Sequence, residues 1–476
     1  MSLLAFIIGM GVASTVGCLT LILIEGRHQI LGKTERIAWG CILGPTLLTF
    51  FFFLLYTADL ILFTRLSLSV SAVLLLLILI GIAWYRKLLH APRFVKPHLE
   101  LPQKKWMKIV LVLIIVWSAM KILAGSLDLL TTPTYWDDAF NNWNMRAKVF
   151  VETQELALEL PGGNDITVTK EGVNSYPPSV PLMKAWLTIL RGEWSEGLAN
   201  SIHAVWYIAL LVSFFFLLRR NENTAVSIIG TYALTSLPLL LIQGLNPYAD
   251  VYVAGHLLLA VGALWRAAEE HESYAIKTWL LLSACVMTAA VFTKNEVLLV
   301  FLPVYILLFA WTLLRHGHAH RISLKQLIQT VITILMMAIV LIAPWLWFKW
   351  ANGLTFGNAK SVSELAIGIT VQTQAAFYAI WYFLTREANF LFLPLAFLFV
   401  FIFSLKRSLL QPIGILALFV LIAFFGQAMI YLLTPLATEA TNQTGLGRGL
   451  VQLAPLAMLF TVIQGKKLIG KGSIDD

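Results

Sequence analysis

Apolar stretches long enough to cross a bilayer as helices recur along the whole chain, separated by short polar segments. They lack the ten-residue alternation of polar and apolar residues that is typical of a membrane β-barrel. The pattern therefore predicts an all-α polytopic membrane protein with about thirteen transmembrane helices. The predicted helices cover residues 3–24, 37–58, 67–85, 107–127, 201–218, 224–244, 249–266, 277–292, 297–314, 327–348, 389–405, 411–433 and 449–464.

Composition favours a membrane protein over a soluble one. Of the 476 residues, 59% are hydrophobic and only 12% are charged, which leaves too little polar surface to cover several soluble cores. Cys18, Cys41 and Cys285 all lie inside apolar stretches, so we interpret them as small buried side chains and expect no disulfide framework. The first apolar stretch follows Met1 without a basic region, which favours a retained transmembrane helix over a cleaved signal peptide.

The basic residues indicate which loops share a side of the membrane. The net charge of +9 is carried by short clusters between apolar stretches, a distribution that encodes topology and gives no reason to expect a nucleic-acid partner. By the positive-inside rule these clusters face the cytoplasm, so the N-terminus is predicted outside and the C-terminus inside. The cytoplasmic set is Arg27, Lys33, Arg36, Arg86, Lys87, Arg93, Lys96, Lys104, Lys105, Arg219, Arg220, Arg315, Arg321, Lys406, Arg407, Lys466, Lys467 and Lys471.

Nearly all other polar clusters fall on the extracytoplasmic side, where we expect them to converge on one site. The apolar stretch 365–384 is interpreted as an external or re-entrant helix, because a further transmembrane helix there would place Lys406 and Arg407 outside. The predicted outer segments are residues 128–200, 244–250, 293–296, 349–388 and 434–448.

The longest outer segment contains "TYWDDAFNNWNMRAKVF", Thr134 to Phe150, in which two adjacent carboxylates precede an amphipathic pattern. Apolar and aromatic side chains recur there at helical spacing, which predicts a helix lying on the outer membrane surface. Asp138 is predicted to be its N-cap, where free backbone N–H groups favour a carboxylate. Arg146 and Lys148 fall on other faces, and we expect them to contact lipid headgroups; the alternative is that they bind a phosphate group at the site.

Asp137 and Asp138 have two interpretations. They are a helix cap with a solvated neighbour, or they are functional carboxylates at the depth of the membrane interface, beside Tyr135 and Trp136. We favour a functional role, because ionisable groups at such a depth are costly and several other polar segments are predicted on the same side.

Five segments in a fixed order carry a resemblance to a known family. An acidic loop before an amphipathic helix, between two transmembrane helices, resembles the first outer loop of the GT-C integral-membrane glycosyltransferases, which include protein O-mannosyltransferases and the lipid A aminoarabinose transferase. The segments similar to patterns of bacterial members are "DAFNNWNMRAK" (Asp138–Lys148), "SYPPSVPLMKAWL" (Ser175–Leu187), "PYADVYVAG" (Pro247–Gly255), "TKNEVLL" (Thr293–Leu299) and "GLGRGLVQLAP" (Gly445–Pro455).

The resemblance implies transfer of a sugar from a polyprenyl-phosphate carrier to an acceptor hydroxyl or amine. Arg146 replaces a Lys of the family pattern, Val297 a Gly, and Gly447 an Asp, and three helices precede the acidic loop where better-known members have one. We therefore expect two parts. Residues 1–106 would form N-terminal transmembrane helices with a basic cytoplasmic loop, and residues 107–476 a GT-C-like catalytic module.

The resemblance also implies roles for particular residues. An acceptor hydroxyl needs a carboxylate to take its proton, and Asp138 is the aspartate in register with the family pattern, with Asp137 as the second candidate. The departing lipid phosphate needs fixed cations, for which Arg448 is the first candidate and Lys294 the second. The alternative for Lys294 is an ion pair with Glu296 that stabilises a short turn.

The substrate-binding candidates are Asp250, Tyr176, Glu296 and Trp143. Asp250 would orient the sugar or, together with the acidic pair, hold Mg²⁺ or Mn²⁺, and its alternative is a simple helix cap. No cofactor is firmly implied. Tyr176 precedes two prolines that are predicted to form a rigid turn into a short helix.

The predicted partners are a polyprenyl-phosphate sugar donor, the lipid bilayer, and a lipid, glycan or protein acceptor, at a bacterial inner membrane. One alternative function is a polytopic transporter, which usually carries ionisable residues near the midplane on broken helices. Another is a flippase or polymerase of lipid-linked glycans. The charges crowd at one surface and the long outer segment comes early, which favours a transferase.

Overall fold

Every regular element in the described part of the chain is a helix. The computed structural model describes residues 2–89, 102–135, 138–159, 173–319, 321–355, 371–434, 436–442 and 445–470. Within these ranges, eleven helices are long and apolar enough to cross a membrane. They are α1 (Ser2–Glu25), α2 (Lys33–Thr57), α3 (Arg65–Tyr85), α4 (Lys105–Thr131), α7 (Glu196–Arg219), α10 (Asp250–Glu269), α11 (Ser273–Ala290), η3 with α12 (Val297–His318), α13 (Leu324–Asn352), α18 (Gly414–Leu433) and α20 (Leu446–Ile469).

Shorter helices connect these spans or pack beside them, and together they confirm the predicted all-α polytopic fold. They are η1 (Ala139–Asn144), α5 (Met145–Thr153), η2 (Val173–Ser175), α6 (Ser179–Arg191), α8 (Thr224–Thr235), α9 (Pro238–Gly244), α15 (Val371–Thr385), η4 (Ala388–Phe390), α16 (Leu393–Phe403), α17 (Leu405–Leu410) and α19 (Ala437–Thr441).

The predicted helix count corresponds approximately to the structure. The predicted span 224–244 is the pair α8 and α9, bent by 77°, and counting the pair as one span brings the total in the described ranges to twelve. The predicted span 389–405 corresponds to α16, an apolar helix of 11 residues. The undecided stretch 365–384 overlaps α15, which packs against α18 and α19, while its first residues lie outside the described part.

The break between α8 and α9 has a local cause. Pro238 begins α9 and has no backbone N–H to donate into α8. A neighbouring helix compensates, because Lys121 of α4 donates to the backbone oxygen of Thr235 at 3.1 Å and to the Ser236 hydroxyl at 3.2 Å. A bent span inside a bilayer is stable only when its open backbone groups find such partners.

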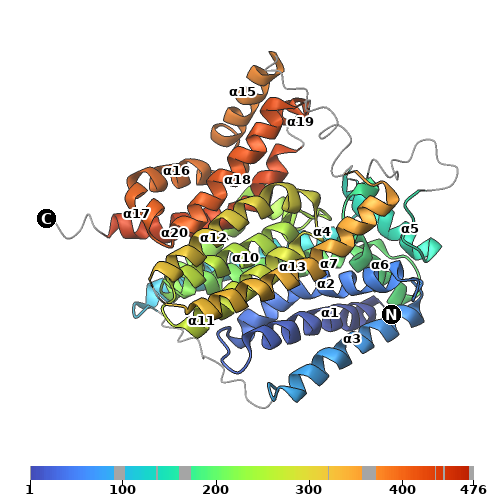
Figure 1. The fold of residues 1–476 in the computed structure, drawn as a ribbon. Helices are drawn as coiled ribbons and strands as arrows, with labels where there is room; N and C mark the ends of the chain where they lie inside the picture. Colours follow the sequence, from blue (N-terminus) through green and yellow to red (C-terminus); the bar gives the residue numbers. More distant parts are fainter. Residues whose placement is uncertain are drawn as a thin grey trace.

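Helix α10 is the centre of the bundle, where it packs against α7, α11 and α20 with nearly all of its residues buried. Its polar side chains pair inside the protein, since both the Tyr252 hydroxyl and the His256 ring bond to Thr46 of α2. In Figure 1 the helices α1 to α3 lie at one edge of the bundle, and α16 to α20 lie across the central helices from them. Asp250, the first residue of α10, is therefore anchored in the most closely packed part of the fold.

The helix directions place polar groups at two ends of the bundle. α10 begins at Asp250, and α11 ends shortly before Lys294, so these two side chains meet at one end, which we call the site end. At the opposite end, called the basic end, Arg220 pairs with Glu35 at 2.6 Å and so joins two of the loops predicted to be cytoplasmic. Which end faces the cytoplasm stays a prediction.

Candidate active site

The site end brings together side chains that are far apart in the sequence. It does so because α4, α10, α11, α13 and α20 all begin or end there, so the links between them meet. The predicted site residues found at this end are Asp138, Trp143, Tyr176, Asp250, Lys294, Glu296 and Arg448. Asp137 lies outside the described residues.

Asp138 and Arg448 form an ion pair that joins the first outer segment to the last transmembrane helix. The Asp138 side chain is 44% exposed and the Arg448 side chain 23% exposed, so the pair lies at the surface of the site. The Arg448 guanidinium also lies 6.0 Å from the centroid of the Tyr248 ring, a cation–π contact. The predicted base and the predicted phosphate ligand are therefore in direct contact.

The helix after Asp138 differs from the predicted surface helix. Asp138 precedes η1 as expected, but its side chain makes no capping hydrogen bond and pairs with Arg448 instead. Arg146, which we expected to contact lipid headgroups, is only 2% exposed, so that prediction was wrong. Its guanidinium donates to the backbone oxygen of Tyr176 at 3.0 Å, and burial lowers its pKa to about 9. Lys148 is exposed as predicted. Arg146 is buried because α5 packs against α6, which covers the helix face that holds Arg146.

A second charge cluster lies deeper, around Lys294. The ammonium group contacts Asp250 at 2.9 Å and Glu296 at 2.8 Å, and Gln452 donates to the same Asp250 oxygen at 2.6 Å. Burial by itself would lower the pKa of Lys294, but the two carboxylates outweigh it and raise the pKa above its ordinary value. Lys294 therefore keeps its charge. The structure also contains the ion pair with Glu296 that we gave as the alternative role of Lys294.

The carboxylates at this end are engaged by cations. Asp250 bonds Lys294 and Gln452, and Asp138 bonds Arg448. Among the described residues, no three His, Cys, Asp or Glu side chains lie close enough together to hold a metal ion. A role for Mg²⁺ or Mn²⁺ stays a prediction.

Tyr176 is held beside these charges by a rigid turn. The turn leads through two prolines into α6, as predicted, and Asn295 donates to the backbone oxygen of Ser175 at 3.1 Å. Trp143 is buried and meets the Tyr176 ring edge-on, with centroids 6.1 Å apart. Burial raises the pKa of the Tyr176 phenol, and the nearby carboxylate of Glu296 adds to the rise. The hydroxyl therefore stays protonated and can donate a hydrogen bond.

A buried polar network beneath the acidic loop was not identified from the sequence. Lys184 of α6 donates to the side chain of Asn144, and Glu196 accepts the backbone N–H of Thr134 at 2.7 Å. These contacts fix both ends of the segment that carries Asp138. Burial lowers the pKa of Lys184 well below its ordinary value. The available signal was a single lysine inside the apolar run "PLMKAWL", since such a residue must find buried partners.

The structure explains why glycine, and not the aspartate of the family pattern, stands at position 447. A Cβ atom at this position would lie 3.0 Å from the Phe383 ring and 3.2 Å from the Leu239 side chain, closer than ordinary van der Waals contact. An aspartate therefore does not fit beside α15 without a rearrangement. The acidic partner of Arg448 is Asp138, supplied by the first outer segment.

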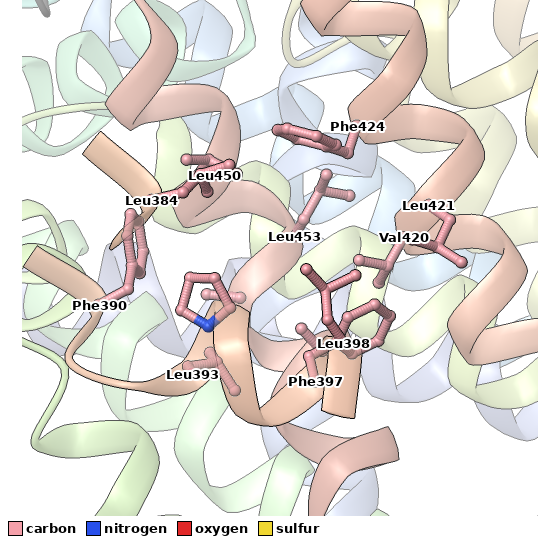
Figure 2. Close-up of a pocket in the computed structure, with 13 residues that line it drawn as sticks. Leu384, Phe390, Leu393, Phe397, Leu398, Val420, Leu421, Phe424, Leu450 and Leu453 are labelled. Atoms are coloured by element: carbon pink, nitrogen blue, oxygen red, sulfur yellow. The ribbon is translucent and has the colours of Figure 1, made fainter. Parts of the chain in front are cut away.

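An apolar pocket lies beside the helix that carries Arg448. Its volume is about 90 Å³, and its lining side chains, all apolar, come mainly from α16, α18 and α20 (Figure 2). Leu450 and Leu453 of α20 line it within two turns of Arg448, facing Phe397 of α16 and Phe424 of α18. The pocket therefore offers hydrocarbon contact close to the charged site.

Comparison with known proteins identifies the fold. No family model matches the chain, and no curated protein matches it in sequence. The fold is similar to one known from solved membrane proteins, and it agrees with the GT-C-like fold that the sequence motifs led us to expect. A solved structure with this fold is ArnT from Cupriavidus metallidurans, bound to undecaprenyl phosphate. It matches over 76% of this chain and 62% of its own, with a TM-score of 0.51 and 14% sequence identity. The chain thus has a multi-pass helical fold similar to that of ArnT, and the match spans less than two thirds of the ArnT chain.

Proposed function

We propose that this protein is a glycosyltransferase that moves a sugar from a polyprenyl-phosphate donor to an acceptor at the extracytoplasmic face of a bacterial inner membrane. The observation that carries the proposal is the ion pair between Asp138 and Arg448. It joins a proton acceptor and a phosphate-binding group in one accessible site, which sugar transfer from a lipid phosphate requires. The undecaprenyl phosphate bound to ArnT belongs to the donor class proposed here.

In the proposed reaction, Asp138 takes the proton of the acceptor hydroxyl or amine while that group forms a bond to the anomeric carbon of the sugar. The bond from this carbon to the phosphate oxygen breaks, and its electron pair leaves with the polyprenyl phosphate. Arg448 binds the phosphate oxygens with its planar pair of donors. It therefore stabilises the charge that grows on the leaving group.

Donor binding would also release the base. In the structure, Arg448 neutralises Asp138. A phosphate group competes for the same guanidinium because it offers two oxygens to the two donors of the arginine fork. When Arg448 turns to the phosphate, the carboxylate of Asp138 becomes available for the acceptor proton. Proton removal is thereby coupled to the presence of the sugar donor.

The deeper cluster would support this exchange. Lys294 keeps its positive charge and so offsets part of the negative charge of Asp250 and Glu296, which would otherwise oppose the phosphate. Asp250 is fully buried, so we assign it the role of positioning Lys294. Glu296, whose side chain is 35% exposed, and Tyr176 are better placed to hydrogen-bond the sugar.

The lipid part of the donor would lie against α20. The apolar pocket lined by Leu450 and Leu453 is within two turns of Arg448, so a phosphate held at Arg448 leaves the attached isoprenoid units next to hydrocarbon. A volume of about 90 Å³ accommodates a short part of the chain, and the remainder would extend into the bilayer.

The test is sugar transfer in proteoliposomes from radiolabelled polyprenyl-phosphate sugars. Asp138→Asn should reduce turnover by about 10²-fold or more, because the asparagine cannot accept the proton. Glu193→Gln is the matched control, since Glu193 is an exposed acid of the same outer segment. Full activity of Asp138→Asn would exclude the assigned base. Movement of the labelled lipid across the bilayer without transfer would favour a flippase.

A labelling experiment tests the proposed side of the membrane. A cysteine in place of Lys148, which is exposed near the site, should react with an impermeant maleimide in intact cells. A cysteine in place of Lys325, exposed near the start of α13, should react only after permeabilisation. The reverse pattern would place the site in the cytoplasm.

A further inference from the structure

A second and larger cavity lies between α1, α2, α3, α11 and α13, away from the candidate active site. Its volume is about 1090 Å³. Most of its wall is hydrocarbon, formed by side chains such as Leu47, Phe51, Leu79, Met336 and Leu341. The flanking helices α3 and α13 bury few of their residues inside the protein. The cavity is therefore a groove that borders the bilayer.

Basic side chains gather at one end of this groove. Arg27 and His28 follow α1, Arg86 follows α3, and Lys277 belongs to the start of α11, and all four line the cavity. This is the basic end of the bundle, because α11 runs from here toward Lys294 at the site end. The groove thus changes from charged to apolar along the direction of the helices.

The mouth of the groove is held by its own contacts. Arg86 donates to the backbone oxygen of Leu23 at 2.9 Å. The Tyr274 hydroxyl donates to the backbone oxygens of Glu25 and His28, the latter at 3.0 Å, and the His28 and Tyr274 rings lie 4.4 Å apart. These bonds tie the ends of α1 and α3 and the start of α11 into a defined surface.

Within the part of the chain that the structure describes, acidic side chains do not neutralise the positive charge at the mouth. Within the described residues, no carboxylate forms a salt bridge with Arg27, Arg86 or Lys277. Glu25 is the one acid among the described residues that line the groove. Its carboxylate is already bound by Arg36 at 2.9 Å and by two backbone N–H groups. An anion at the mouth would therefore meet three cations.

We propose that this groove binds an anionic phospholipid, with its phosphate at Arg27, Arg86 and Lys277 and its acyl chains along the apolar wall. Basic pockets between transmembrane helices are suited to anionic headgroups, whereas a zwitterionic lipid brings a cation of its own to the same mouth. The paired methionines Met336 and Met337 adapt readily to flexible hydrocarbon chains. The proposal is independent of the sugar-transfer site at the opposite end.

The test measures lipid retention by the full-length protein with native mass spectrometry. Phosphatidylglycerol should remain bound at a concentration at which phosphatidylcholine dissociates. The triple variant Arg27→Gln, Arg86→Gln, Lys277→Gln should weaken phosphatidylglycerol binding by about tenfold or more. The matched control replaces exposed basic residues of the same end outside the groove. It is Lys104→Gln, Lys105→Gln, Lys325→Gln, and it should bind like the wild type.

A second measurement locates the lipid without relying on the variant. Phosphatidylglycerol with a photoactivatable group in one acyl chain should crosslink to groove residues such as Leu79 or Met336. Equal retention of both lipids, or crosslinks confined to other surfaces, would overturn the proposal. Displacement of phosphatidylglycerol from the groove by equimolar undecaprenyl phosphate, or a dimer in place of the lipid-bound monomer, would assign the groove to a different occupant and overturn it as well.

Discussion

The two ends of the bundle use positive charge in opposite ways. At the site end, Arg448 and Lys294 each contact a carboxylate, and these pairs hold loops from distant parts of the chain together. At the basic end, Arg27, Arg86 and Lys277 line a groove without an acidic partner among the described residues. On the proposals above, the paired charges form a polar site that a substrate enters by exchange. The charges without an acidic partner among the described residues attract an anion from the membrane. Charge pairing therefore distinguishes the ends better than net charge does.

The largest expected effect comes from breaking the deeper pair. Lys294→Met should lower the free energy of unfolding by about 3–5 kcal/mol, because it leaves the buried carboxylate of Asp250 without its cation. Unfolding of the purified protein in detergent measures this. Lys325→Met, at an exposed position of the basic end, should leave stability unchanged. Adding Asp250→Asn to Lys294→Met should recover part of the loss, and no recovery would contradict the assignment.

The next effect is on catalysis at the surface pair. Arg448→Ala should reduce sugar transfer by about 10²–10³-fold, as expected for loss of a group that stabilises transition-state charge. Arg448→Lys should lie between this variant and the wild type, because it keeps the charge and loses the fork. Initial rates in proteoliposomes report both, with Lys406→Ala at an exposed position of α17 as the control. Unaltered turnover in Arg448→Ala would remove the phosphate-binding role.

A smaller effect concerns pH and the network beneath the acidic loop. The folded state holds the pKa of Lys184 below the ordinary value of about 10.4, so between the two values the unfolded state binds more protons. Stability should therefore rise with pH in this window, by at most about 1.4 kcal/mol per pH unit from this group. Unfolding curves from pH 7 to 10 should show the rise in wild type and in Lys148→Met. A similar rise in Lys184→Met would show that other groups cause it.

The smallest effect concerns packing beside Arg448. Gly447→Ala should lower stability by about 1 kcal/mol, because the added methyl group crowds the Phe383 ring. Phe383→Leu should be less harmful in the Gly447→Ala background than alone. Thermal unfolding of the four proteins forms a double-mutant cycle. Strict additivity would mean that the two side chains do not compete for space.

Most of the fold could be predicted from the sequence, because a bilayer requires long apolar helices and such helices appear as long apolar stretches in the sequence. The ends and bends of helices were harder. The stretch 224–244 reads as one apolar span, and Pro238 alone does not distinguish a kink from a break of 77°. The shortness of α16 was missed for a similar reason, since the apolar residues Phe390, Leu391 and Phe392 precede its first residue, Leu393.

The sequence predicted that the candidate site residues converge, but it did not predict the buried contacts that hold them in place. The topology predicted from the loop charges placed Asp138 and Arg448 on the same side, and the structure puts them in contact although 309 intervening residues separate them. The burial of Arg146 and the network of Lys184 depend on how α5 and α6 pack on each other. An amphipathic pattern shows which residues are apolar, and it does not show which polar residues a neighbouring helix will cover.

The contact of Lys121 with the broken span bears on how the protein enters the membrane. Lys121 lies within α4, and its acceptor, the carbonyl of Thr235, follows 114 residues later in the chain. During synthesis α4 therefore emerges with an ammonium group that has no acceptor yet. We expect α4 to remain at the insertion machinery, or at the interface, until α8 arrives, so that the two segments partition into lipid as a pair.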